Sequence, residues 1–93
     1  MDPVRDKICF ITYIYILKSK KDGRMYTGYT SDLRKRLTQH NKGLSTHTKN
    51  RGPFVIIYYE ACLLEEKARS RELFLKSGMG KRYLKNRLGA SYL

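Results

Sequence analysis

The sequence predicts a small α/β (α+β) domain, in which a three-stranded antiparallel or mixed sheet is flanked by about three helices. Two observations lead to this fold. Runs rich in β-branched and aromatic residues occur beside segments with apolar side chains at helical spacing. Clusters of turn-forming residues separate these segments, and no repeat or linker interrupts them. A chain of 93 residues is expected to form one domain, spanning 1–93 with its core at about 12–88.

The first two strands are predicted to pair as a hairpin. Residues 8–17 are rich in β-branched and aromatic side chains, and residues 24–29 return after the turn signal Asp22-Gly23. The pairing is therefore expected to be antiparallel. Gly28 removes a side chain from the second strand, which leaves space where another backbone or a ligand can come close.

A helix is predicted to follow the hairpin. Ser31 is a suitable N-cap, and Asp32 is placed to interact favourably with the helix dipole. The helix is expected to end at about Asn41. Leu33 and Leu37 form its one apolar stripe, so it should pack on the sheet through a single face.

The second half of the chain is predicted to contain one strand and two helices. Residues 55–59 form a continuous apolar run, which indicates a strand that is central or covered on both faces. Residues 63–77 are expected to form a helix whose buried stripe begins at Leu64 and which Gly78 ends. Residues 81–88 are expected to form a short third helix.

The charge of the chain indicates a polyanionic partner. Twenty Lys and Arg residues against eight Asp and Glu residues give a net charge of +12, a field that attracts nucleic acids and speeds their association. Eight tyrosines accompany the basic residues, a combination typical of nucleic-acid-binding proteins. A membrane-surface role is less favoured, because the sequence contains neither a long basic amphipathic helix nor an apolar run of about 18 residues.

The N-terminal stretch and the cysteines lead us to expect a cytoplasmic protein. The N-terminal stretch is too short and too polar for a signal peptide. Cys9 and Cys62 form no CxxC pair and have no neighbouring His pair, which argues against a zinc site and against a disulfide framework. Buried thiols in a reducing compartment are the expectation.

Residues 44–53 form a polar and basic loop with two interpretations. The loop is either an ordinary solvated connection or a clamp for the backbone of a nucleic acid. Hydroxyl, amide and cationic side chains are the usual donors to phosphate, and Lys49 and Arg51 are the candidate contacts here. The composition leaves both interpretations open.

Few carboxylates are available to bind a metal ion. Five of the eight are in the N-terminal stretch, the predicted turn, the start of the first helix or the end of the third strand. On the second predicted helix, Glu72 lies on the flank of the apolar face and Glu65 shares that edge, whereas Glu66 points further out. Glu72 is equally suited to pair with Lys76, four residues later. Spacing alone therefore selects no metal ligand.

Two tyrosine triplets face each other across the predicted hairpin, Tyr13-Ile14-Tyr15 and Tyr26-Thr27-Gly28. Arg36 and His40, four residues apart, leave the next helix on the same side. Together with the segment 68–78, which contains an Arg-Glu pair, these motifs resemble the GIY-YIG nuclease family. The likeness is to its small stand-alone members, which are similar to the N-terminal nuclease part of the excinuclease.

The resemblance covers residues 12–88, nearly the whole chain, with the motifs in order. It departs from the family triplets at Tyr13, which replaces Gly, and at Thr27, which replaces Ile. Neither position carries the chemistry that the family implies. The departures indicate a divergent subgroup, in which substrate preference can differ.

The resemblance implies a role for each residue of the site. Tyr15 and Tyr26 would project into it, one to activate or orient the attacking water and the other to hold the metal-water shell or the phosphate, with Tyr15 favoured as the base. Arg36 would bind the scissile phosphate. His40 would orient a tyrosine, contact phosphate or act as an acid. Glu72 would be the single protein ligand of one Mg²⁺ or Mn²⁺ ion.

The resemblance also implies a substrate and an activity. The expected protein is a divalent-metal-dependent endonuclease that hydrolyses DNA, structure-selective or weakly sequence-selective, in a process such as DNA repair. Lys76, Lys81 and Asn86 would contact the nucleic-acid backbone. RNA as a substrate, a protein partner that supplies specificity, and the oligomeric state stay open. The alternative is a non-catalytic DNA- or RNA-binding module that retains the nuclease fold.

Overall fold

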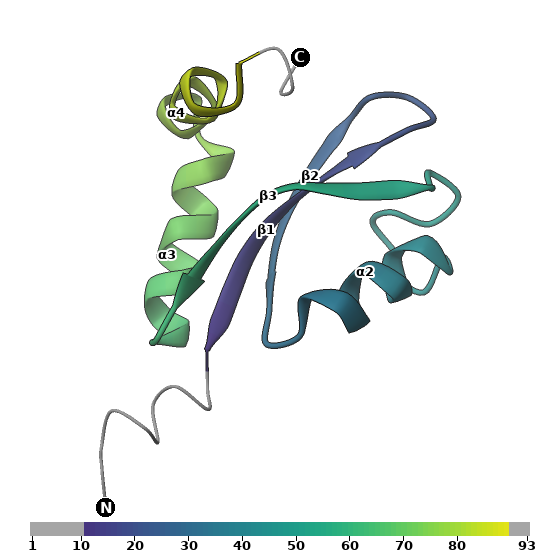
Figure 1. Ribbon diagram of the computed structural model, residues 1–93, viewed down its shortest axis with the longest axis horizontal. Helices are drawn as coiled ribbons and strands as arrows, with labels where there is room; N and C mark the ends of the chain where they lie inside the picture. Colours follow the sequence, from purple (N-terminus) through teal and green to yellow (C-terminus); the bar gives the residue numbers. More distant parts are fainter. Residues whose placement is uncertain (1–10, 90–93) are drawn as a thin grey trace, which may run out of the picture.

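A computed structural model describes residues 11–89 and contains a three-stranded antiparallel sheet with three helices (Figure 1). This confirms the predicted fold class. The strand order is β2-β1-β3, so β1 is the central strand. In chain order the elements are β1 (Thr12–Ser19), β2 (Met25–Thr30), α2 (Leu33–Asn41), β3 (Phe54–Cys62), α3 (Glu65–Lys76) and α4 (Gly78–Leu88).

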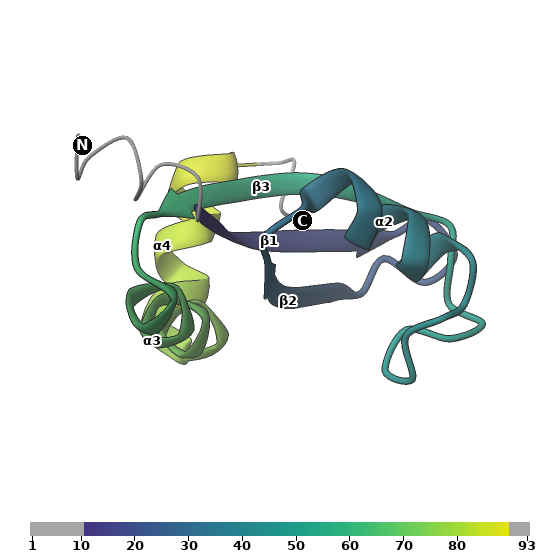
Figure 2. The same ribbon diagram turned by 90° about the horizontal axis from the view of Figure 1, so that it is seen from below.

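The helices lie on opposite faces of the sheet, with α2 on one side and α3 on the other (Figures 1 and 2). Strand β1 supplies the core of both faces because its side chains alternate between them. Ile14 and Ile16 pack against α3 and α4, where they meet Ala68, Leu75 and Leu84. Tyr15 and Leu17 pack on the other face with Phe54, Leu33 and Leu37. Side chains of this one strand therefore belong to the core on both faces of the sheet.

The turn and the end of the hairpin come later than predicted. Strand β1 extends to Ser19, two residues beyond the predicted end, and β2 is shifted by one residue at each end. The Ser19 side chain accepts hydrogen bonds from the backbone N–H groups of Lys21 and Asp22 at 3.1 and 3.2 Å, so the turn forms after Ser19. Residues 8–10, predicted to start the strand, lie outside the described residues.

The third strand, which was predicted to be central or covered on both faces, is not central. Strand β3 pairs only with β1 and lies at the edge of the sheet. Its apolar run does not imply burial, since Tyr59 is 57% exposed. The side chain of Asn41 covers the start of this edge, accepting from Phe54 N at 2.6 Å and donating to Phe54 O at 3.3 Å. Cys62 is a free thiol and is half-buried, where a buried thiol was predicted.

The helix ends also differ from the predictions. The N-cap of α2 is Asp32, whose carboxylate accepts from Lys35 N at 3.0 Å, and Ser31 does not cap the helix. Helix α3 begins two residues late, because Leu64 is its N-cap and is exposed. Gly78 does not end the helical region. It is the first residue of α4, whose N-cap Ser77 accepts from Gly80 N at 3.2 Å.

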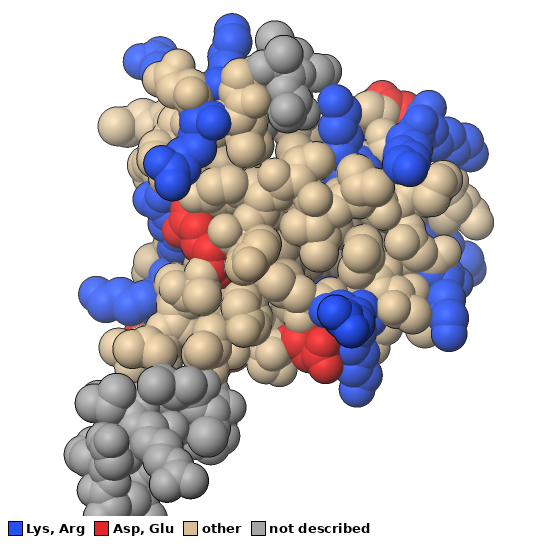
Figure 3. Space-filling model, viewed as in Figure 1, with Lys and Arg blue, Asp and Glu red and all other residues tan. Residues whose placement is uncertain are grey.

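Figure 3 shows the distribution of charged side chains on one face of the molecule. Lys and Arg side chains stand out around its margin, whereas Asp and Glu side chains form only small patches. Among residues 11–89, no helix combines the length and apolar character needed to cross a membrane.

The junction between α3 and α4 requires a glycine, which gives a first prediction. A Cβ atom on Gly80 would lie 1.9 Å from the backbone oxygen of Phe74. We expect Gly80→Ala to reduce the free energy of unfolding in urea by at least about 2 kcal/mol, because the two helices must separate. Gly78→Ala is the matched control, since a Cβ there meets no atom within 4 Å. Equal stability of the two variants would contradict the account of this junction.

Candidate functional site

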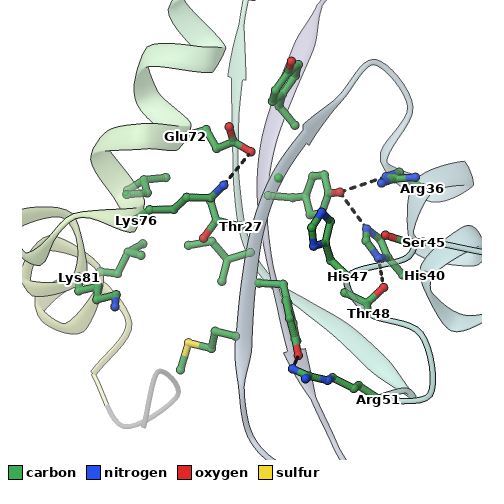
Figure 4. Close-up of a pocket in the computed structure, with 18 residues that line it drawn as sticks. Thr27, Arg36, His40, Ser45, His47, Thr48, Arg51, Glu72, Lys76 and Lys81 are labelled. Atoms are coloured by element: carbon green, nitrogen blue, oxygen red, sulfur yellow. Dashed lines mark hydrogen bonds and ion pairs between the residues drawn. The ribbon is translucent and has the colours of Figure 1, made fainter. Parts of the chain in front are cut away.

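An open pocket of about 790 Å³ lies against the edge strand β2. Residues 25–29 of β2 form its floor together with Tyr15 and Ile16 of β1. Helices α3 and α4 line one side, and α2 with the following loop lines the other (Figure 4). The first side carries Glu72, Lys76 and Lys81, and the second carries Arg36, His40, Ser45, His47, Thr48 and Arg51.

Tyr15 reaches this pocket because Gly28 has no side chain. The two residues are opposite each other in the β1–β2 pairing. A Cβ atom on Gly28 would lie 2.6 Å from the Tyr15 hydroxyl oxygen and 2.8 Å from its Cζ. The phenol ring therefore lies over the glycine. The space predicted at Gly28 is filled by this ring.

Two side chains of helix α2 contact the Tyr15 hydroxyl through nitrogen atoms. Arg36 Nε donates to the hydroxyl oxygen at 3.3 Å, and His40 Nε2 lies 2.9 Å from the same oxygen (Figure 4). The two side chains reach one target because they are one helical turn apart. On the other side of the imidazole, Nδ1 lies 2.6 Å from the hydroxyl oxygen of Thr48.

This environment keeps Tyr15 and His40 uncharged at neutral pH. Burial raises the pKa of Tyr15 above its usual value of about 10, the Arg36 guanidinium opposes the shift and the Glu72 carboxylate adds to it. Burial also lowers the pKa of His40, and the nearby Arg36 lowers it further. The phenol is therefore protonated and the imidazole is neutral.

Tyr26, the tyrosine of the second triplet, contacts the loop of residues 44–53. Arg51 donates from Nη1 to the Tyr26 hydroxyl, and its guanidinium lies 5.8 Å from the centre of the Tyr26 ring. The hydrogen bond to Tyr26 raises the pKa of Arg51. The loop that contains Arg51 is thus attached to the floor of the pocket. Because Ser45 and Thr48 are buried, the loop is not an ordinary solvated connection.

Glu72 is the one carboxylate that lines the pocket among residues 11–89. Its side chain is 16% exposed, whereas the competing residues Glu65 and Glu66 are exposed and lie outside the pocket. Lys76 Nζ lies 3.5 Å from Glu72 Oε2, so the alternative ion pair forms as well. Glu72 therefore belongs to the pocket and to a helix-surface pair at the same time.

The residues of the pocket fit a hard divalent cation with few protein ligands. Within the described part of the chain, no group of three or more His, Cys, Asp or Glu side chains is arranged to hold a metal ion. One carboxylate beside an open, polar pocket suits Mg²⁺ or Mn²⁺, because such ions keep several waters and share a substrate phosphate. Zinc, which prefers three or four N or S ligands, does not fit this set.

Most of the residues predicted for the site come together, and two do not. All five predicted catalytic residues line the pocket, as do Arg51, Lys76 and Lys81. Lys49 and Asn86 are exposed and do not line it. Sequence reasoning missed individual roles for Ser45, His47 and Thr48. A hydroxyl residue in a polar loop gives no sequence signal of burial, so Thr48 could not be distinguished from its neighbours.

Comparison with known proteins gives a matching family model and similar relatives. The family model described as the GIY-YIG catalytic domain matches residues 11–87. The UPF0213 protein CPE1444 of Clostridium perfringens is 42% identical over 67 residues, which cover 71% of each chain. The UPF0213 protein SSP2268 of Staphylococcus saprophyticus is 40% identical over 74 residues, 78% of this chain and 89% of the relative.

A solved structure has the same arrangement of strands and helices. The solution NMR structure of the UPF0213 protein BH0048 from Bacillus halodurans is similar with a TM-score of 0.53 and 36% sequence identity. The likeness covers 88% of this chain and 89% of that one. The fold described above is therefore shared with a relative.

The neutral imidazole of His40 predicts that acid destabilises the fold. His40 has a pKa below the value of about 6.5 expected in the unfolded chain, because burial and Arg36 disfavour its charge. Unfolding therefore takes up a proton as the pH falls through 6.5. Stability from this group is complete above that pH and is lost progressively below it.

Thermal unfolding at several pH values between 8 and 5.5 measures this effect. We expect Tm to fall by several degrees over this interval and the fall to be smaller in His40→Gln. Carboxylates titrate near pH 4 and contribute little in this range. His47→Gln is the control, since His47 is exposed, and it should keep the slope of the wild type. An unchanged slope in His40→Gln would contradict the assignment.

Proposed function

Because the chain belongs to the GIY-YIG catalytic domain family, we propose that it is a metal-dependent endonuclease that hydrolyses DNA phosphodiester bonds. One observation carries this proposal. The Tyr15 hydroxyl and the Glu72 carboxylate, which come from different faces of the sheet, both line the same basic pocket. A buried tyrosine or a helix-surface glutamate alone would have an ordinary structural role.

The scissile phosphate would lie between the two sides of the pocket. Lys76 and Lys81 provide positive charge from α3 and α4, and Arg36 and Arg51 provide it from the other side. These cations, like the hydroxyl groups of Ser45 and Thr27, are common partners of phosphate and sugar oxygens, and they would bind the nucleic-acid backbone here. Weak sequence selectivity, with recognition of backbone shape, follows from this chemistry.

Glu72 would hold one Mg²⁺ or Mn²⁺ ion together with water and a phosphate oxygen. When bound, such an ion supplies an activated water and neutralises charge on the phosphate. Two hydrogen bonds fix the guanidinium of Arg36, since its Nη1 donates to Gln39 Oε1 at 3.1 Å and its Nε donates to the Tyr15 hydroxyl, and in this position it would bind the phosphate. Tyr15 then holds or transfers a proton at its hydroxyl, and the Arg51–Tyr26 pair orients the nucleic acid.

The biological setting extends the same proposal. A basic DNA nuclease with half-buried free Cys62 suits the reducing cytoplasm and a role such as DNA repair. A partner protein could direct it to its target. The specific competing function is non-catalytic binding of DNA or RNA, which the Lys76–Glu72 ion pair favours because it occupies the carboxylate that a metal ion would need.

Cleavage assays separate these two functions. Purified protein is incubated with single-stranded, duplex and flapped DNA, and with RNA, in the presence of Mg²⁺ or Mn²⁺. We expect DNA cleavage that requires the metal, and a loss on the order of 10³-fold in Glu72→Ala, because a bound metal contributes several kcal/mol to catalysis. Glu65→Ala is the matched control, since Glu65 lies on the same helix outside the pocket. Salt-sensitive binding without turnover would favour the non-catalytic module.

The ion pair at Glu72 gives a further prediction. Lys76→Met removes the cation 3.5 Å from the carboxylate, so binding of Mn²⁺ measured by calorimetry without DNA should become about two- to fivefold tighter. Binding of DNA should become weaker in the same variant. Lys67→Met is the control, because Lys67 is exposed on α3 outside the pocket. Weaker Mn²⁺ binding in Lys76→Met would show that Glu72 is not the ligand.

A further inference from the structure

The buried hydroxyl of Thr48 has one hydrogen-bond partner in the described part of the chain. Its oxygen lies 2.6 Å from His40 Nδ1, and only 1% of the residue is exposed. A buried hydroxyl proton needs an acceptor, and a hydroxyl that only accepted here would leave that proton without one. Thr48 therefore donates to His40 Nδ1.

This direction of donation decides the tautomer of His40. A ring nitrogen that accepts a hydrogen bond carries no proton, so the proton of a neutral imidazole must be on the other nitrogen. That nitrogen is Nε2, which lies 2.9 Å from the Tyr15 hydroxyl oxygen. We propose that Thr48 is a positioning residue that holds His40 in the Nε2–H tautomer, so that His40 donates to Tyr15 and does not act as its base.

The consequence for Tyr15 follows from the geometry of a phenol oxygen. It accepts from Arg36 Nε at 3.3 Å and from His40 Nε2–H, and these two donors occupy its lone pairs. Its own proton must then point in the remaining direction, away from these two nitrogen atoms. Proton exchange takes place there, with an oxygen of substrate or solvent.

This assignment makes His40 and Arg36 a pair of donors for one oxygen. When the phenol gives its proton to an oxygen in the pocket, the negative charge that stays on the phenolate is held by two N–H groups, one of them cationic. The catalytic part of the inference rests on the proposed nuclease function. The tautomer itself does not, because it depends only on contacts within the folded chain.

Nitrogen NMR of the histidine rings tests the tautomer directly. Long-range ¹H–¹⁵N spectra of the full-length, metal-free protein at about pH 7.5 distinguish protonated from unprotonated ring nitrogens. We expect Nε2 of His40 to be protonated and Nδ1 to be unprotonated, whereas the exposed His47 shows averaged signals. An Nδ1–H tautomer of His40 in the wild type would overturn the proposal, whether or not any variant folds.

Two variants of Thr48 connect the tautomer to activity. Thr48→Val keeps the shape and removes the donor, so the His40 signals should shift toward the Nδ1–H form, and Thr48→Ser should restore the wild-type spectrum.

In cleavage assays, Thr48→Val should lower kcat about tenfold at unchanged KM for DNA, the effect of one misdirected hydrogen bond, and Thr48→Ser should recover the wild-type kcat. Unchanged His40 signals in a folded Thr48→Val protein would overturn the role of Thr48. A wild type with the expected tautomer and no cleavage would reject the nuclease function alone.

Discussion

The close contact between the Tyr15 ring and Gly28 is the constraint on which the pocket depends. Tyr15 belongs to the central strand, and a Cβ atom on Gly28 of the neighbouring strand would lie 2.6 Å from its hydroxyl oxygen. A single missing Cβ on the neighbouring strand lets the ring lie over β2 and line the pocket. Arg36 and His40 on α2 are then placed by the same hydroxyl, because both contact its oxygen. One backbone position thus organises three functional side chains.

The two sides of the pocket are held together by β1, whose alternating side chains belong to two separate cores. On one face of β1, Ile14 and Ile16 pack in the cluster that contacts α3. On the other face, Tyr15 and Leu17 pack in the cluster that contacts α2. The rotation of α3 is fixed further by Arg71, which donates to both carboxylate oxygens of Glu60 at 2.9 and 3.0 Å. Since Arg71 and Glu72 are consecutive on the helix, an ion pair on the covered face of α3 directs its neighbour into the pocket.

Local sequence patterns made much of the fold and of the candidate site predictable. The hairpin and the placement of Arg36 and His40 follow from residue spacing that needs no tertiary knowledge. Glu72 needed the family resemblance, because its helical position was also suited to pairing with Lys76. The edge position of β3 could not be predicted, because an apolar run reports affinity for a strand and says nothing about the number of neighbours. Thr48 could not be predicted because its burial results from a loop folding back onto α2.

The charge balance of the pocket constrains how metal and substrate would bind if the proposed function holds. One carboxylate faces the cations of Arg36, Arg51, Lys76 and Lys81. A divalent ion at Glu72 alone would be repelled by Lys76, which lies 3.5 Å from the carboxylate. A phosphate would offset the repulsion between Lys76 and the ion, because it attracts both of them and supplies oxygen ligands to the ion. Metal and nucleic acid would therefore bind cooperatively, and each would be held weakly without the other.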